Sequence, residues 1–264
     1  MVILALVANG LYEVLSTPAF QWDVVAANVL NKLVLQGLGM TLLLTLITTV
    51  TGAVAGILLA AARLSSNPVL RALSSAYVWF FRSVPLLVQL IFWFNIGYLF
   101  PRLSLSVPFG GPEIVGIDSR DLVGSFLVAV IALTLHEAAY AAEIVRGGVL
   151  SVDEGQREAG LSLGLSRSSI FLTVVLPQAM RSMLPPFGSL VIGILKATSL
   201  VSTIAVTDLM GAVSNIYNRT FEVIPLLVVA TLWYLVVTSI LSVFQHLIER
   251  RFGRGATRNE QAGI

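Results

Sequence analysis

The chain has 264 residues, of which 56% are hydrophobic and only 11% are charged, and its formal net charge is +2. Soluble domains carry about 25% charged residues, so the composition excludes an ordinary soluble domain. Because the chain has no cysteine, a disulfide framework, a zinc–thiolate site and a thiol nucleophile are also excluded.

The charged residues are separated by long apolar stretches. No Asp, Glu, Lys or Arg lies between Lys32 and Arg63, between Arg82 and Arg102, or between Glu222 and Glu249. A hydrocarbon core of about 30 Å needs roughly 20 apolar helical residues, and open sheets cannot satisfy their backbone groups in lipid. We therefore expect an all-α integral membrane protein with about five transmembrane helices. Hydropathy places these spans at residues 36–62, 76–100, 122–145, 183–206 and 221–247.

Residues 1–31 form a separate segment ahead of the first span. Residues 1–11 are apolar, but the run is short and has no basic residue before it, so it does not resemble a secretory signal. It is either part of an additional helix or a surface segment, and both alternatives stay open. We expect residues 1–31 to be extracytoplasmic.

The basic residues predict the orientation of the spans. With the N-terminus outside, eleven basic residues fall inside, four fall outside and Lys196 lies in the membrane. The positive-inside rule therefore favours an N-out, C-in topology. The basic tail at 251–264 then lies in the cytoplasm beside anionic lipid and needs no nucleic-acid partner.

Two loops have contrasting compositions. The outer loop at 101–121 is rich in proline and glycine, which predicts an irregular, partly ordered lid. In the inner loop, Ser151 and Glu154 form a capping-box pattern that predicts a helix start, and Gly164 predicts its end. A second helical run, at 166–176, is expected to stop at Pro177. Two short cytoplasmic helices between spans three and four are typical of a docking element.

The stretch GQREAGLSLGLSRSSIFLTVVLPQAMR, at 155–181, resembles the cytoplasmic EAA loop of ATP-binding-cassette (ABC) importer permeases. Together with three further stretches, it extends the resemblance over about residues 35–253, which implies a type-1 ABC transmembrane domain at 32–250. The further stretches resemble bacterial polar-amino-acid permeases: FFRSVPLLVQL at 80–90, AAYAAEIVRGGVLSV at 138–152 and LKATSLVSTIAV at 195–206.

The resemblance implies a permease subunit in the bacterial cell membrane that imports a polar amino acid or a related small zwitterion. Two permeases, identical or homologous, would form the pathway. Two ABC ATPase subunits would dock on the cytoplasmic loops, and an extracytoplasmic binding protein would deliver the substrate. The chain has no Gly-x-x-x-x-Gly-Lys-Ser/Thr loop, so we expect no enzyme activity and no bound cofactor. ATP and Mg²⁺ would belong to the partner ATPase.

The loop at 147–182 is the expected ATPase-coupling element. Its small residues allow close approach to a partner helix, and Glu158 can pair with a basic group there. The alternative is that the glycines only shape a turn and that Glu158 is solvated. The residues to which the resemblance assigns coupling are Glu158, Ala159, Gly160, Leu163, Gly164 and Pro177.

A few ionisable residues lie within the spans, where such groups are costly and are functional candidates by default. Lys196 follows Pro185 by about 16 Å of helix, near the midplane. We predict that Lys196 lies near Glu137 or His136 and either contacts substrate or forms a structural pair. No metal site is expected, because adjacent helical residues point about 100° apart. The candidate pathway residues are His136, Glu137, Tyr140, Gln89, Lys196, Thr198 and Ser199.

Other positions have mainly structural interpretations. Glu143 and Arg146 are one turn apart and predict an ion pair that anchors the docking loop. Arg82 is expected at the inner end of span two, reaching the cytoplasmic surface. Gly52 and Gly56 form a Gly-x-x-x-Gly pattern that permits close helix packing, although this pattern is frequent by chance.

The sequence departs from the family pattern where related permeases place polar residues. Ser189 and Leu190 replace an amide and an acidic or amide residue, Ala197 replaces an aspartate, and Ser83–Val84 replaces Gly-Thr. Either the substrate is less polar than usual, or the chain is one half of a heterodimer. A peptide or modified amino acid is the alternative solute, and a channel is the alternative class.

Overall fold

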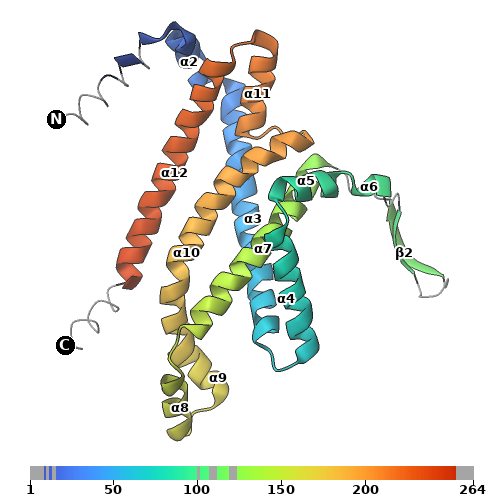
Figure 1. The fold of residues 1–264 in the computed structure, drawn as a ribbon, viewed down its shortest axis with the longest axis vertical. Helices are drawn as coiled ribbons and strands as arrows, with labels where there is room; N and C mark the ends of the chain where they lie inside the picture. Colours follow the sequence, from blue (N-terminus) through green and yellow to red (C-terminus); the bar gives the residue numbers. More distant parts are fainter. Residues whose placement is uncertain are drawn as a thin grey trace.

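The computed structural model describes residues 16–99, 102–106, 112–118 and 124–253, together with residues 9, 12 and 13. Long helices form a bundle, with a helical pair at one end and a β hairpin extending to the side (Figure 1). In chain order, the elements are η1 (Pro18–Phe20), α2 (Trp22–Val29), α3 (Lys32–Leu64), α4 (Pro68–Ser83), α5 (Leu86–Phe94), α6 (Ile96–Leu99), β1 (Arg102–Ser106), β2 (Glu113–Asp118), α7 (Ser125–Leu150), α8 (Glu154–Ser162), α9 (Arg167–Ile170), η2 (Phe171–Val175), α10 (Leu176–Ala197), η3 (Thr198–Ile204), α11 (Leu209–Thr220) and α12 (Val223–Gly253).

The membrane-spanning helices confirm the predicted fold class. Four helical stretches are long and apolar enough to cross a bilayer: Lys32–Leu64, Ser125–Leu150, Arg167–Ile204 and Val223–Arg251. The helices α4 and α5 form a fifth span if the bent pair is taken as one. The open question of an additional helix refers to residues 1–11, of which only residue 9 is among the described residues.

The second span is broken instead of continuous. The helices α4 and α5 meet at an angle of 102°, because Pro85 cannot continue the helical hydrogen bonding of α4. The helix α4 begins at Pro68, four residues after α3 ends at Leu64, so Arg82 lies about 21 Å along α4 from its inner end. The prediction that Arg82 marks the inner end of this span is therefore wrong.

The fourth span also differs from the prediction at its start. The run from Arg167 does not stop at Pro177, because α9 continues through the π-helical turn η2 into α10. Pro177 lies in the first turn of α10, directly after η2, so the helical run passes through this proline instead of ending at it. The second predicted docking helix is thus the beginning of the fourth span.

The outer side contains two elements that differ from the predictions. Within the outer loop, β1 and β2 pair as an antiparallel hairpin, with Arg102 opposite Asp118, so these described residues are not irregular. The helix α11, between the fourth and fifth spans, was not predicted. It begins at Asp208, whose side chain accepts a hydrogen bond from the backbone N–H of Gly211.

The helices α3 and α7 form the central contact of the bundle. Gly52 and Gly56 lie on the face of α3 against α7, and a Cβ at Gly56 would lie 2.5 Å from the Cβ of Ala141. Thr51 and Thr134 are joined by a hydrogen bond of 2.7 Å between their hydroxyls. The Gly-x-x-x-Gly pattern therefore brings the two backbones close together, as in small-residue membrane interfaces.

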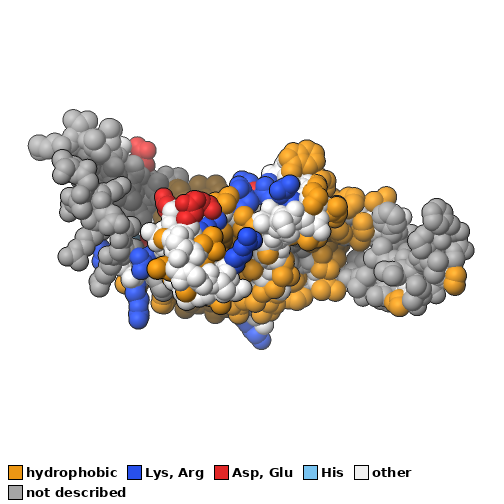
Figure 2. Space-filling view, turned by 90° about the horizontal axis from the view of Figure 1, so that it is seen from below, with side chains coloured by type: hydrophobic (Ala, Val, Ile, Leu, Met, Phe, Trp, Pro, Cys, Tyr) orange, Lys and Arg blue, Asp and Glu red, His pale blue; other side chains and the backbone are white. Residues whose placement is uncertain are grey.

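The α8–α9 end is the cytoplasmic end under the positive-inside rule. Seen from this end (Figure 2), acidic and basic side chains gather on the exposed surface, and hydrophobic side chains cover the flanks of the spans. The N-terminus of α3 and the helix α11 lie at the opposite end (Figure 1).

We predict that Gly56→Val lowers the free energy of unfolding by about 1–3 kcal/mol, because the added side chain overpacks the α3–α7 contact. Unfolding in mixed detergent micelles measures this change. Gly39→Val on the same helix is the control, since a Cβ at Gly39 meets nothing within 4 Å. Equal losses in the two variants would contradict the assigned contact.

Candidate functional site

The helix α8 is the first part of the predicted docking element. It begins at Asp153, whose carboxylate accepts a hydrogen bond of 2.7 Å from the backbone N–H of Gly155. The predicted capping residue, Ser151, instead donates to the backbone carbonyl of Gly148 and contacts the Ser182 hydroxyl at 3.0 Å. Asp153 is the better cap because it directly precedes the first helical turn.

Two glycines shape the turn between α8 and α9. Gly164 has a φ of +74°, the left-handed conformation that ends helices and favours glycine. Gly160 is buried, and a Cβ there would lie 2.8 Å from Cγ1 of Ile170. The two glycines therefore fold α8 tightly against α9, as the turn-shaping interpretation requires.

The α8–α9 element is connected firmly to the spans. Val152, Ile170, Val175, Ala179 and Met183 form a small hydrophobic core that joins the loop to α7 and α10. Arg157 donates to the Val149 carbonyl at 2.8 Å, which adds a polar link between α8 and the end of α7. A displacement of α8 would consequently move the ends of two spans.

The opposite face of α8 is open. The side chain of Glu158 is exposed and makes no hydrogen bond or ion pair within the described part of the chain. Leu163, which directly follows α8, is 79% exposed, whereas Leu161, 52% exposed, lines the cavity on the side of the spans. The exposed carboxylate of Glu158 is therefore available to a partner.

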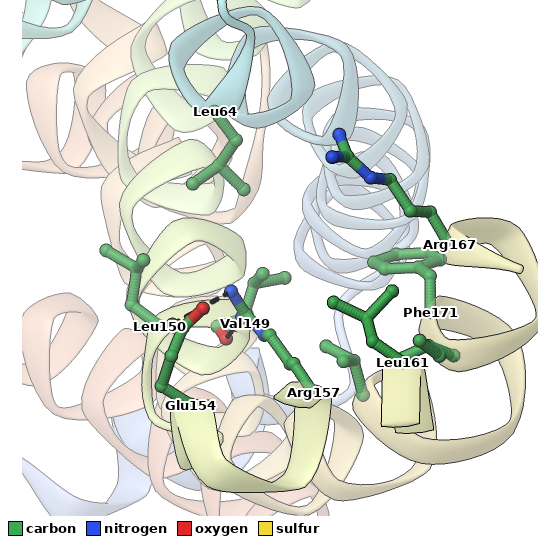
Figure 3. Close-up of a pocket in the computed structure, with 10 residues that line it drawn as sticks. Leu64, Val149, Leu150, Glu154, Arg157, Leu161, Arg167 and Phe171 are labelled. Atoms are coloured by element: carbon green, nitrogen blue, oxygen red, sulfur yellow. Dashed lines mark hydrogen bonds and ion pairs between the residues drawn. The ribbon is translucent and has the colours of Figure 1, made fainter. Parts of the chain in front are cut away.

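A cavity of about 480 Å³ lies between α8, α9 and the inner ends of α3 and α7. Figure 3 shows Leu64 above it, Val149 and Leu150 on α7, and the side chains of Arg157 and Arg167 from the two docking helices. Arg157 and Glu154 lie 3.6 Å apart in this cavity. The lining is mostly apolar, and its charged members are Glu154, Arg157 and Arg167.

A second group of polar residues follows one face of α7. Gln89 is only 3% exposed and donates to the backbone carbonyls of Phe81 and Val84, at 3.0 and 2.8 Å. It also contacts Nδ1 of His136 at 3.1 Å. Gln89 therefore satisfies carbonyls that the break at Pro85 leaves without helical donors, which is a structural role.

The polar line continues from His136 toward the inner end. The rings of His136 and Tyr140 are 5.0 Å apart, and the Arg82 guanidinium lies over the Tyr140 ring at 5.4 Å. Arg82 then reaches Glu143, at 3.6 Å. We name Gln89, His136, Tyr140, Arg82 and Glu143 the polar line.

Glu143 is the centre of a three-arginine cluster. It pairs with Arg146 at 3.0 Å, as their spacing predicts, and Arg63 at the end of α3 donates to its other oxygen. The neighbouring cavity, of about 400 Å³, is lined by Arg63, Ser75, Val78, Trp79, Arg82, Ser83, Tyr140 and Glu143.

The expected proximity of Lys196 to Glu137 or His136 is not found. Lys196 is exposed at the end of α10 and makes no ion pair with any described residue. Glu137 is buried against α3, near Gly52, and therefore points away from the polar line. The hydroxyls of Thr198 and Ser199 donate to local carbonyls at the start of η3, both at 2.7 Å.

The sequence did not predict a buried polar contact among three helices near the outer end. Asp208 is fully buried, caps α11, and lies 3.4 Å from the Thr41 hydroxyl and 3.5 Å from the Tyr234 hydroxyl. It joins α3, α11 and α12. The aspartate before a helical run was the available signal, but Thr41 and Tyr234 are too distant in sequence to be inferred.

No group of three or more His, Cys, Asp or Glu side chains that could hold a metal occurs within the described residues. The fold and these two sites define a multi-spanning membrane transport subunit with a cytoplasmic docking element. The comparisons with known proteins support this class. Residues 52–254 match the family of binding-protein-dependent transport system inner membrane components, and the chain belongs to that family.

Individual relatives cover most of the chain. The arginine transport system permease protein ArgU of Corynebacterium glutamicum is 41% identical over 97% of this chain and 80% of its own length. The L-cystine transport system permease protein TcyB of Bacillus subtilis is 34% identical over 93% and 97%. A crystal structure of an amino acid ABC transporter with histidines matches with a TM-score of 0.71 at 32% identity, covering 83% of this chain and 94% of that one.

We predict that Gln89→Leu lowers the free energy of unfolding by roughly 1–3 kcal/mol, because the carbonyls of Phe81 and Val84 lose their donor inside the bundle. Detergent unfolding again provides the measurement. Gln178→Leu is the matched control, since Gln178 is exposed and bonds only locally, to the Val174 carbonyl. A neutral Gln89→Leu variant would show that the break does not need this side chain.

Proposed function

We propose that this chain is the permease subunit of an ATP-driven importer for an amino acid or a related small zwitterion. The observation that carries the proposal is the exposed face of α8, joined by a hydrophobic core to α7 and α10. Family membership supports it, because components of binding-protein-dependent systems work with delivery proteins. It also disfavours the channel alternative.

We infer the partners from the exposed face of α8 and from the family of the chain. Two ATPase subunits would bind ATP and Mg²⁺ and dock on α8 of two permease copies, identical or homologous. A binding protein would deliver the solute to the outer side. Closure of the ATPases would displace α8 as a rigid body and, through the core at its base, rock α7 and α10.

The amino-acid assignment rests on the relatives and on the polar line. The relatives include arginine and L-cystine permeases, so similarity alone does not select one amino acid. His136 and Tyr140 are the predicted pathway residues for which the geometry is favourable, because they lie on the line that ends at the half-exposed Arg82. Lys196 stays a candidate because its side chain is exposed in the last turn of α10 and makes no ion pair with a described residue.

We predict that Glu158→Lys reduces ATP-driven uptake at least tenfold while the permease stays in the membrane, because reversing the charge breaks its charge-assisted contact with the ATPase. Uptake into proteoliposomes and co-purification of the ATPase are the measurements. Gln156→Lys is the control. Gln156 is two positions before Glu158 on α8, so the two side chains point about 200° apart around the helix. Normal uptake by Glu158→Lys would contradict coupling through α8.

We further predict that the complete transporter imports free amino acids and not sugars or dipeptides. Competition by a panel of unlabelled solutes against radiolabelled amino acids, in proteoliposomes containing the ATPase and the binding protein, measures the specificity. Uptake of a dipeptide with no amino-acid uptake would instead support the alternative solute.

A further inference from the structure

The three-arginine cluster carries more positive charge than its known contacts require. Arg63 and Arg146 each bond to one oxygen of Glu143, and Arg82 lies 3.6 Å from the same carboxylate. No second carboxylate lies within 4.0 Å of these guanidiniums among the described residues. Two positive charges are therefore left without an anionic partner in this part of the structure.

Arg82 is the arginine that is available for a ligand. Its side chain is 46% exposed, against 18% for Arg63 and 34% for Arg146. Its distance to Glu143 is too long for a hydrogen bond, and it donates none within the described residues. Its guanidinium lies over the Tyr140 ring, 5.4 Å from the ring centroid, and its N–H groups are available to bind.

The cavity beside Arg82 has the size and lining of a small-molecule site. Its volume of about 400 Å³ falls within the roughly 300–1,000 Å³ of typical ligand pockets. The hydroxyls of Ser75 and Ser83, together with Glu143, offer hydrogen-bond acceptors in the same cavity. Guanidinium edges bind carboxylates with two parallel hydrogen bonds, and the acceptors suit an ammonium group.

We propose that this cavity is an inner binding site for a free amino acid, in which Arg82 holds the α-carboxylate. The proposal deepens the proposed function and rests on it: the site lies at the Glu143 end of the polar line, along the path that an imported amino acid would follow. Accumulated amino acid on the cytoplasmic side would occupy the same site and slow further import.

Binding of radiolabelled L-arginine to the permease–ATPase complex in nanodiscs tests the site without requiring transport. We expect saturable binding that Arg82→Gln weakens about ten- to hundredfold, the range for a lost charge-assisted hydrogen bond. Arg71→Gln is the matched control, because Arg71 is an exposed arginine on the same helix without an ion pair to a described residue. Agmatine, which is arginine without its carboxylate, should bind at least tenfold more weakly than L-arginine.

Trp79 reports occupancy of this cavity, because it lines the wall and is 70% exposed. L-arginine should change the tryptophan emission of the wild type and not that of Trp79→Phe. Arg82→Lys, which keeps the charge, should show intermediate affinity. The proposal is overturned if Arg82→Gln binds L-arginine as tightly as the wild type does, or if agmatine binds as tightly as L-arginine. It is also overturned if acetate displaces the radiolabelled L-arginine as well as unlabelled L-arginine does, because the cavity would then be a small-anion site only.

The site and the proposed function can fail separately. A wild-type transporter that imports no amino acid contradicts the proposed function. The inner site alone is contradicted if the transporter imports amino acids but Arg82→Gln leaves two properties unchanged. These are the affinity for L-arginine and the slowing of import by amino acid accumulated on the cytoplasmic side.

Discussion

Lipid offers no hydrogen-bond partners, so the polar groups within the bundle must be satisfied by the chain itself. This constraint explains the irregular parts of the spans. At the break between α4 and α5, the amide of Gln89 takes the place of missing backbone donors. Where α10 passes into η3, Thr198 and Ser199 donate to the last carbonyls. At both places, side chains donate to backbone carbonyls where the regular helix ends.

The same solvent provides little hydrophobic force between helices, so the bundle depends on close packing. Gly52 and Gly56 let α3 approach α7, and Gly148 lies against Met183, which joins the inner ends of α7 and α10. These contacts, with the core below α8, connect the docking helix to the spans without a flexible linker. A push on α8 would therefore reach the helices that carry the polar line.

The gaps between charged residues predicted the first and fifth spans, because span length in lipid depends mainly on the absence of charge. The second span was predicted as continuous, and its bend of 102° at Pro85 depends on what α5 packs against. The Glu143–Arg146 pair is local and was predicted from its spacing. Arg63 is 80 residues from Glu143, and no sequence period relates them. Lys196 was predicted to need a partner, but an exposed lysine needs none from the chain.

The three arginines around Glu143 illustrate how one sequence feature serves two purposes. Topology requires only that basic residues stay on the cytoplasmic side, and arginines in water would meet that requirement without cost. Arg63 is instead partly buried with Glu143, inside the junction of α3, α4 and α7. Removing charges from water is expensive unless partners replace the lost hydration, and one carboxylate cannot balance three guanidiniums. An anionic ligand at Arg82 would supply part of the missing balance, which is the physical reason to look for one there.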